Sequence, residues 1–361
     1  AFGKPLAEVD AEWREWARGD SGVAWATDYG PPPLPEKPNN EELAVLERLN
    51  EVRGTALAYS LPLVEGDMID MSSGTMGPLP PCQLDAEASL ACEAHSQYLT
   101  MHTDTHLRWP EAHEEDPAHP EFTPRGMRAA MRSVIVFLNA DGGVSFARGS
   151  VDGWRGTPYH RFPLLEHNIN RFGYSYVYNN GWSVATLDMG SLEEPYDPRI
   201  APKLVAWPPP NMKNVPRRFH GREHPNPLGD QPEDQQDITK TGYPISLQLQ
   251  KEWAGRLSAS SIDVYIAKKR GKLPAKNFIA KGTREYADYE ARRTDPVAIW
   301  KHTPEVPLLK RMEMRDVVFA IPKEPLRPKT TYQVEIMLHL QKEFYFVWEF
   351  TTGSQMEGLK F

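Results

Sequence analysis

The sequence contains little cysteine, no excess of basic charge and no long apolar run. Its 361 residues include two cysteines, Cys82 and Cys92, which permit one small-loop disulfide and equally permit two free thiols. The formal net charge of -8 argues against a nucleic-acid partner, because phosphate binding needs a basic surface. No apolar run approaches the roughly 20 residues that cross a bilayer, so no transmembrane segment is expected.

Several common catalytic motifs are also missing. No G-x-S-x-G nucleophile elbow occurs, and neither cysteine has the flanking residues of a catalytic nucleophile. The glycine-rich stretches at residues 141–143 and 149–156 match no phosphate-cradling loop. Serine-hydrolase and nucleotide chemistry therefore find no support. The enzymatic activity that survives is metal-assisted or histidine–carboxylate hydrolysis.

Proline, in contrast, is abundant. The 34 prolines are about twice the usual share of roughly 5%, which favours turns, extended connections and edge strands over long helices. Residues 1–39 combine a short amphipathic helix with a proline run, and we expect this arm to lie over the body of the protein. The length of the chain predicts two domains behind this arm.

The first half of the chain has mainly helical patterns. Residues 41–54, 84–102, 123–138 and 150–165 are predicted helices, the last broken at Pro158. Asn39 or Asn40 is the expected N-cap of the first helix and Asp85 that of the second. A hairpin is then predicted around Asn180-Gly181.

The pattern changes near Pro195. A stretch rich in proline and charge is followed by runs that alternate with period two and are rich in β-branched and aromatic residues. This pattern predicts an all-β sandwich. The predicted strands are residues 243–249, 258–267, 316–322, 330–338 and 344–353.

Four motifs in the first half follow one another in a familiar order. They are "CEAHSQYL" (92–99), "HEEDP" (113–117), "W-x-x-T-P-Y-H-R" (154–161) and a hairpin that ends in "D-M-G" (188–190). This order resembles the bacterial branch of the CAP superfamily, which comprises the cysteine-rich secretory, antigen-5 and pathogenesis-related proteins. The resemblance covers about residues 40 to 192, with an insertion near 56 to 80. It implies an α-β-α sandwich with a central cleft lined by histidines and acidic residues.

Carried over by position, the resemblance implies a set of cleft residues. The cleft histidines are His113 and His160, and His95 matches a further histidine of bacterial members. The family's "G-E-N-I" segment falls near residues 131–136, which hold no acid, so Glu114 or Glu115 is the expected substitute. Three imidazoles with a carboxylate are a ligand set that zinc prefers. The alternative is that each histidine is a structural hydrogen-bonding group, and three further histidines are expected at the surface, His102, His106 and His119.

The C-terminal part resembles bacterial immunoglobulin-like modules. The resemblance rests on "KEPLRPKTTYQVEIML" (323–338) and "YFVWEFTTG" (345–353). The predicted fold class is therefore α+β, a CAP-like α-β-α sandwich followed by an all-β immunoglobulin-like sandwich. The predicted domains are the N-terminal arm (1–39), the CAP-like domain (40–195) and the β-sandwich (202–355).

Together these features predict an exported protein, secreted or held in the cell envelope. The cleft would bind a small-molecule, lipid-like or envelope ligand, and the immunoglobulin-like module would act as a spacer or dock on a protein partner. The start of the chain at "AFGKPL" is compatible with cleavage of a leader, and export would favour a Cys82–Cys92 disulfide. The alternative is a peptide or ester hydrolase that uses the same cleft through zinc or a histidine–glutamate pair.

Overall fold

The computed structural model describes the chain from residue 37 to residue 354 with gaps. The described ranges are 37–59, 68–71, 76–108, 110–190, 204–219, 223–249, 258, 261–268, 296–302, 317–339 and 343–354. They form two compact units that interleave along the chain. Unit 1 takes the described residues within 37–43, 84–141 and 173–188, and unit 2 takes all the others. The predicted helix and proline-rich arm before residue 37 and the predicted boundary at 195–202 lie outside the described residues, so the domain bounds stay a prediction.

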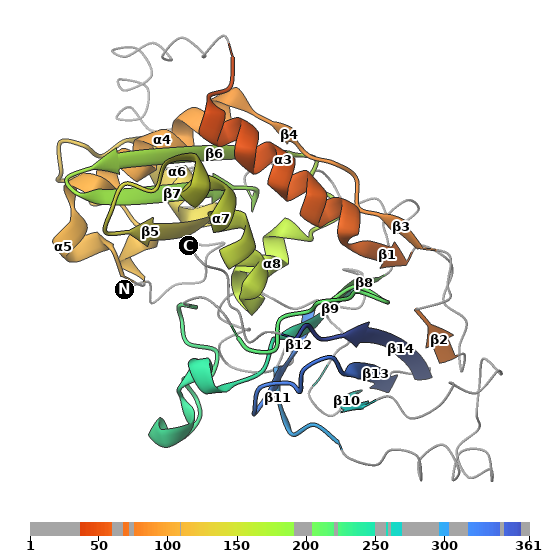
Figure 1. Cartoon of the computed structure of the whole chain (residues 1–361). Coiled ribbons are helices and arrows are strands. Elements are labelled where there is room, and N and C mark those ends of the chain that lie inside the picture. The colour runs from red at the N-terminus through yellow and green to blue at the C-terminus, as the bar shows by residue number, and fades with distance from the viewer. Residues whose placement is uncertain are drawn as a thin grey trace, which may run out of the picture. The chain divides into compact units, whose positions relative to one another are not determined.

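Unit 1 is built on one antiparallel sheet with strand order β4-β6-β7-β5 (Figure 1). The bounds are Gln83–Leu84 for β4, Arg171–Asn179 for β6, Trp182–Asp188 for β7 and Ser133–Leu138 for β5. The β6–β7 hairpin turns at Asn180 and Gly181, whose φ angles are +50° and +79°. Asparagine and glycine tolerate this left-handed backbone, and the hairpin predicted from the sequence is confirmed.

Helix α4 (Ala86–Met101) packs on this sheet, with Tyr98 and Leu99 against Ile135 and Val184. Its N-cap is Asp85, as predicted, and the Asp85 side chain accepts from the backbone N–H of Ala88. The helix lies very close to β6, because a Cβ atom at Gly173 would lie only 2.4 Å from the Ala88 carbonyl carbon. The elements that follow α4 are α5 (Thr103–His106), the short 3-10 helix η1 (Glu111–His113) and α6 (Pro124–Arg132).

The predicted helix over residues 123–138 is correct only in its first half. Helix α6 ends at Arg132, and the next residues form strand β5. The sequence "SVIVFL" of β5 is rich in β-branched residues, which favour a strand once sheet partners exist. Because β5 pairs with β7 along its whole length, long-range pairing overrides the helical pattern here.

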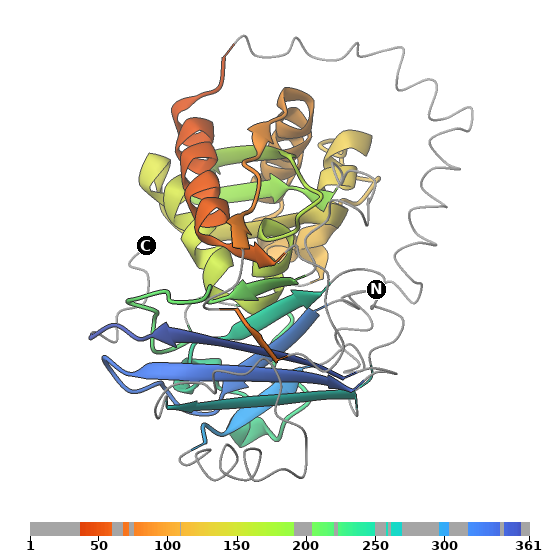
Figure 2. The same ribbon diagram turned by 90° about the vertical axis from the view of Figure 1, so that its right-hand side faces the viewer.

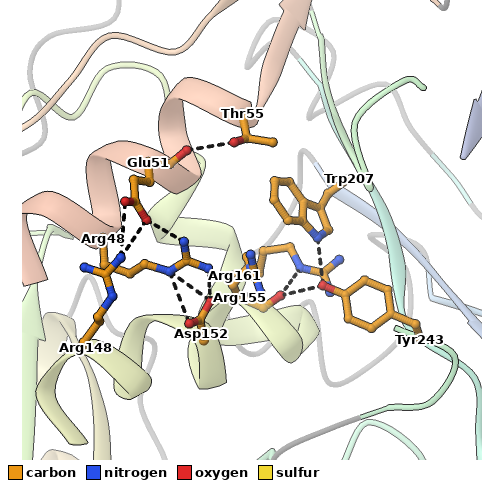
Figure 3. A network of polar contacts seen from close by, with 9 residues as sticks. All are labelled: Arg48, Glu51, Thr55, Arg148, Asp152, Arg155, Arg161, Trp207 and Tyr243. Atoms are coloured by element: carbon orange, nitrogen blue, oxygen red, sulfur yellow. Dashed lines mark hydrogen bonds and ion pairs between the residues drawn. The ribbon is translucent and has the colours of Figure 1, made fainter. Parts of the chain in front are cut away.

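Unit 2 begins with most of α3 (Asn40–Thr55), which lies beside α7 (Gly143–Gly156). Arg48 of α3 donates to the carboxylate of Asp152 on α7, and Arg148 of α7 pairs with Glu51 of α3 (Figure 3). Arg148 also pairs with Glu47 of α3. Helix α7 ends at Gly156, and a new helix, α8 (Pro158–Leu164), begins at Pro158, where the sequence predicts a break in the helix. Proline is tolerated at the start of a helix, because it lacks an N–H group and the N–H groups of the first turn have no acceptor within the helix.

The rest of unit 2 consists of two sheets, both visible in Figure 2. Each of the five runs predicted as strands is a strand of these sheets, which with the helices confirms a mixed α and β fold. An immunoglobulin-like arrangement stays a prediction. One sheet has the order β11 (Ile299–His302), β12 (Val317–Pro322), β9 (Ile245–Leu249), β8 (Leu204–Trp207), β1 (Leu57–Tyr59), β3 (Met76–Pro78), and the other β10 (Ile262–Lys268), β13 (Thr331–His339), β14 (Glu343–Thr351), β2 (Met68–Asp70).

Within the segment predicted as an insertion near 56–80, the described strands β1, β2 and β3 belong to the same sheets as the C-terminal strands. Strand β1 pairs with β8, and β2 pairs in parallel with β14. Strands β8, β9 and β12 are buried at every position, so both faces of their sheet are covered. Part of one face lies under α8, since the Tyr159 ring meets the Phe319 ring at 5.9 Å between centroids.

The predicted Cys82–Cys92 disulfide is not present in the structure. Both cysteines are free, and both are buried. Cys82 is held by Asn50, whose side chain bonds both its N–H and its carbonyl, and its thiol contacts the Ile169 carbonyl at 3.4 Å. Cys92 packs with Ala91 and Ala129. Each thiol is therefore buried among a different set of neighbours, and burial raises the pKa of both thiols.

His302 on β11 predicts a loss of stability in acid. It is 5% exposed, and neither ring nitrogen has a hydrogen-bond partner among the described residues. Burial lowers its pKa to about 4, whereas an unfolded histidine titrates near pH 6.5. Between these values the folded state binds fewer protons, so the free energy of unfolding falls as the pH falls, by about 3 kcal/mol in total. Urea unfolding at pH 7 and pH 4.5 should show this loss reduced in His302→Leu, and equal pH dependence in both proteins would contradict it.

Candidate functional site

His95, one of the three predicted metal ligands, is fully buried on α4. Its Nδ1 lies 3.0 Å from Oε1 of Glu115, and its Nε2 lies 2.9 Å from the carbonyl oxygen of Ala112. Both neighbours are acceptors, unless Glu115 itself carries a proton. Each of the two contacts of the His95 ring therefore contains one proton. The pair is either an imidazolium with a carboxylate or a neutral imidazole with a carboxylic acid. In both forms the pair is neutral overall and leaves no ring nitrogen for an external ligand.

Glu115 is equally buried and is fixed from its other side. Its Oε2 accepts from the backbone N–H of Thr123, the N-cap of α6, at 3.0 Å. A Cβ atom at Gly126 would lie 2.3 Å from Glu115 Oε1, so glycine is the residue that leaves room for this carboxylate. The structure thus brings His95 and Glu115 together, as a buried link between α4 and α6.

His113 and Glu114 lie at the end of η1 in the same unit. Nδ1 of His113 donates to the Ala130 carbonyl at 2.9 Å, and both side chains are half-buried. Burial raises the pKa of Glu114, and the neighbouring Glu111 carboxylate raises it further. A carboxyl group with a raised pKa in a half-buried position is a candidate for ligand contact or proton transfer.

A second histidine cluster surrounds Tyr98, at residues expected to be surface histidines. The Tyr98 hydroxyl lies 3.2 Å from His106 Nε2 and 2.9 Å from His119 Nδ1, and it accepts from the Asp116 N–H. His102 stacks on His119 with 4.0 Å between ring centroids. Tyr98 is in α4, His102 caps the end of α4, and His106 is in α5. The spacing of four residues between these positions was the available signal in the sequence.

In unit 2, the motif around His160 forms the start of α8. Nδ1 of His160 contacts Oε1 of Glu223, and it lies 3.2 Å from Oγ1 of Thr157. The Glu223 carboxylate is buried, whereas 15% of the His160 side chain is exposed. Trp154, four residues before α8, is 2% exposed, and the Glu223 carboxylate holds the imidazole. No pattern in the sequence indicates that Glu223 meets His160.

The motif arginine, Arg161, anchors α8 to the six-stranded sheet. Its guanidinium is buried, donates to the Pro244 carbonyl at 2.9 Å and to Ser246 Oγ at 3.2 Å, and lies over the Tyr243 ring (Figure 3). Burial lowers its pKa to about 10, so it is cationic at neutral pH. The Arg155 carbonyl joins this group, because it accepts from Arg161 Nε and from the Tyr243 hydroxyl.

Arg53 fixes the segment that follows α8. Its guanidinium is fully buried and donates to four backbone carbonyls, each at 2.9 Å. Three of these belong to the stretch directly after His160, at Leu164, Glu166 and Ile169, and the fourth to Pro80. A single side chain from α3 therefore determines the path of this loop.

The residues predicted as one site have separate local partners. His95 contacts Glu115, His113 contacts Ala130, and His160 contacts Glu223. In the part of the chain that the structure describes, no group of three His, Cys, Asp or Glu residues could hold a metal ion. The donor set of His95 does not fit a zinc ligand, because both of its ring nitrogens already have partners. A zinc site formed by His95, His113 and His160 therefore stays a prediction without support from this geometry.

The family comparison agrees with the motif order. Residues 46–189 match the model of the family described as CAP, the cysteine-rich secretory protein family. This stretch is therefore similar to the CAP family, and it contains His95, His113 and His160. The match ends before Glu223 and before the C-terminal strands, whose immunoglobulin-like character no family match supports. In the described residues, no helix is long and apolar enough to cross a membrane.

Two solved structures show a weak likeness to the chain. The copper resistance protein PcoC of Escherichia coli is 13% identical, with a TM-score of 0.21, over 41% of this chain and 94% of its own. Na-ASP-1 is 12% identical, with a TM-score of 0.27, over 45% of this chain. The chain spans 41% of the length of Na-ASP-1. No curated protein matches the chain.

Proposed function

We propose that this chain is an exported binding protein whose CAP domain recognises a small-molecule, lipid-like or cell-envelope ligand. The proposed ligand contact in unit 2 is His160. In unit 1, His113 and Glu114 are the partly exposed members of the predicted site. The C-terminal strands act as a spacer or as an immunoglobulin-like docking module for a protein partner. Zinc is not required for this role.

The observation that supports binding over hydrolysis is the state of His95. A metal-dependent hydrolase needs several ligands with free lone pairs at one ion and an open position for water. His95 is fully buried and both of its ring nitrogens have partners within the protein. Its contacts therefore stabilise the fold, and neither nitrogen is left to bind a metal ion or a ligand. Glu115, the other acid expected to reach the histidines, is used in the same buried pair.

One observation keeps a hydrolase as the second candidate. His160 contacts a buried carboxylate, and a histidine oriented by a carboxylate is the usual form of a general base. Such an enzyme would cleave a peptide or an ester with His160 as base. It would not need the residues of the buried His95–Glu115 pair.

A binding panel distinguishes the two candidates. Purified full-length chain is titrated with a fluorescent sterol, a fluorescent fatty acid and a soluble peptidoglycan fragment, and its metal content is measured by mass spectrometry. We expect one probe to bind, with about tenfold weaker affinity in His160→Ala because a direct polar contact is lost. His339→Ala, on β13, is the matched control and should bind normally. Stoichiometric zinc that disappears in His160→Ala, or turnover of peptide or ester substrates, would overturn the binding proposal.

A further inference from the structure

Glu223 lies outside the CAP match yet contacts its motif histidine. The residue follows the six-stranded sheet's strand β8 in the chain and is 1% exposed. A buried carboxylate needs partners that compensate its lost hydration. Both of the partners described here, Tyr159 and His160, are in the first turn of α8.

The first partner fixes the orientation of the carboxylate. Oε2 of Glu223 accepts from the backbone N–H of Tyr159 at 2.9 Å. This N–H has no acceptor within the helix, because the first N–H groups of any helix lack one, and Thr157 makes no side-chain cap to α8. A backbone donor at the start of α8 thus holds one carboxylate oxygen, and the other oxygen is directed at His160.

The second partner determines the tautomer of the imidazole. Nδ1 of His160 faces Oε1 of Glu223 and Oγ1 of Thr157. The Thr157 hydroxyl donates its own proton to the Trp154 carbonyl at 3.2 Å, so toward His160 it acts as an acceptor. With acceptors on both sides, Nδ1 carries the proton. Every contact described for His160 uses Nδ1, which leaves Nε2 as the ring atom with a free lone pair.

We infer that Glu223 is a positioning residue that holds His160 as the neutral Nδ1–H tautomer, with the Nε2 lone pair directed to the ligand. The ligand group that this lone pair recognises is a hydrogen-bond donor, such as a hydroxyl or an amine. The inference rests on the proposed function only in the assignment of Nε2 to the ligand. The site of the CAP domain is then completed by a residue that lies beyond its matched range.

The variant Glu223→Gln tests the inference, because glutamine has the same shape and reverses one contact. Its amide oxygen can still accept from the Tyr159 N–H, and its amide NH2 then faces His160. An NH2 donor requires Nδ1 as acceptor, so the proton moves to Nε2. Long-range 1H–15N spectra of the full chain with 15N-labelled histidine report the tautomer, and His160→Gln assigns the signals.

We expect the Nδ1–H pattern in the wild type and the Nε2–H pattern in Glu223→Gln. Diethyl pyrocarbonate acylates a free imidazole lone pair, so its rate of reaction with His160 should be at least about tenfold lower in the variant than in the wild type. Glu233→Gln, an exposed carboxylate on η3 (Glu233–Gln235), is the control and should change neither readout. A wild-type spectrum with the Nε2–H or imidazolium pattern overturns the inference, even if Glu223→Gln fails to fold. If the spectra show the expected tautomers but no probe binds, only the proposed binding function is refuted, and the inference about Glu223 stands.

Discussion

Replacing Glu115 with alanine is expected to lower the free energy of unfolding by about 3–5 kcal/mol. The substitution leaves His95 buried with Nδ1 unpaired and removes the acceptor of the Thr123 N–H. A buried donor that loses its partner loses its hydration without compensation. The contact also ties the loop after η1 to α4 and α6, so local order is lost as well. Urea unfolding followed by circular dichroism measures the effect.

Glu115→Gln is the matched variant and should cost only about 1 kcal/mol. Glutamine can accept from the Thr123 N–H with its oxygen and donate to His95 Nδ1 with its nitrogen, while Nε2 of a neutral imidazole still donates to Ala112. The charge of the pair remains zero. A glutamine variant as unstable as the alanine variant would contradict the description of this pair as a neutral hydrogen-bonded unit.

Replacing Arg53 with methionine is expected to destabilise the chain by about 4 kcal/mol or more. Methionine fills a similar volume but donates no hydrogen bond, so three buried carbonyls and the carbonyl of the exposed Pro80 lose their partner. Each unsatisfied buried acceptor costs about 1–3 kcal/mol, and relaxation of the loop recovers part of that sum. Because one of these carbonyls lies at the last residue of α8 and two lie within five residues after it, binding by His160 should weaken together with stability.

The control for this prediction is Arg148→Met. Arg148 forms two ion pairs with carboxylates of α3 at the surface, where 39% of its side chain is exposed, and such pairs contribute about 0–1 kcal/mol. Arg53→Lys should recover only part of the loss, because an ammonium group lacks the planar fork that reaches four acceptors. Equal stability of Arg53→Met and Arg148→Met would contradict the assigned role of Arg53.

Features set by neighbouring residues were predictable from the sequence. The Asn180-Gly181 turn, the Asp85 cap and the break at Pro158 each depend on a backbone preference that one or two residues determine. The five C-terminal strands followed from alternation with period two. Motif order, rather than any single residue, predicted the similarity to the CAP family that the match over residues 46–189 shows.

Features set by distant residues were not predictable in this way. The sequence does not show that Glu223 meets His160, or that Arg53 reaches the loop after α8. The disulfide prediction was wrong for the same reason, since the spacing of two cysteines says nothing about the Asn50 side chain that holds Cys82. The helix predicted through residue 138 ended early because β7 offers a partner to the residues after Arg132.

The pairing of β2 with β14 has a consequence for how the chain is made. Met68 in β2 is aligned with Tyr345 in β14, roughly 280 residues later in synthesis. At about 5–20 residues per second, a ribosome needs about 14–55 s to supply that partner. Throughout this delay β2 has no strand to join, and its open edge can pair with other nascent chains. Slow production of the last strands, or release of a chain shortened before them, would therefore leave the first half exposed to aggregation and dependent on chaperones.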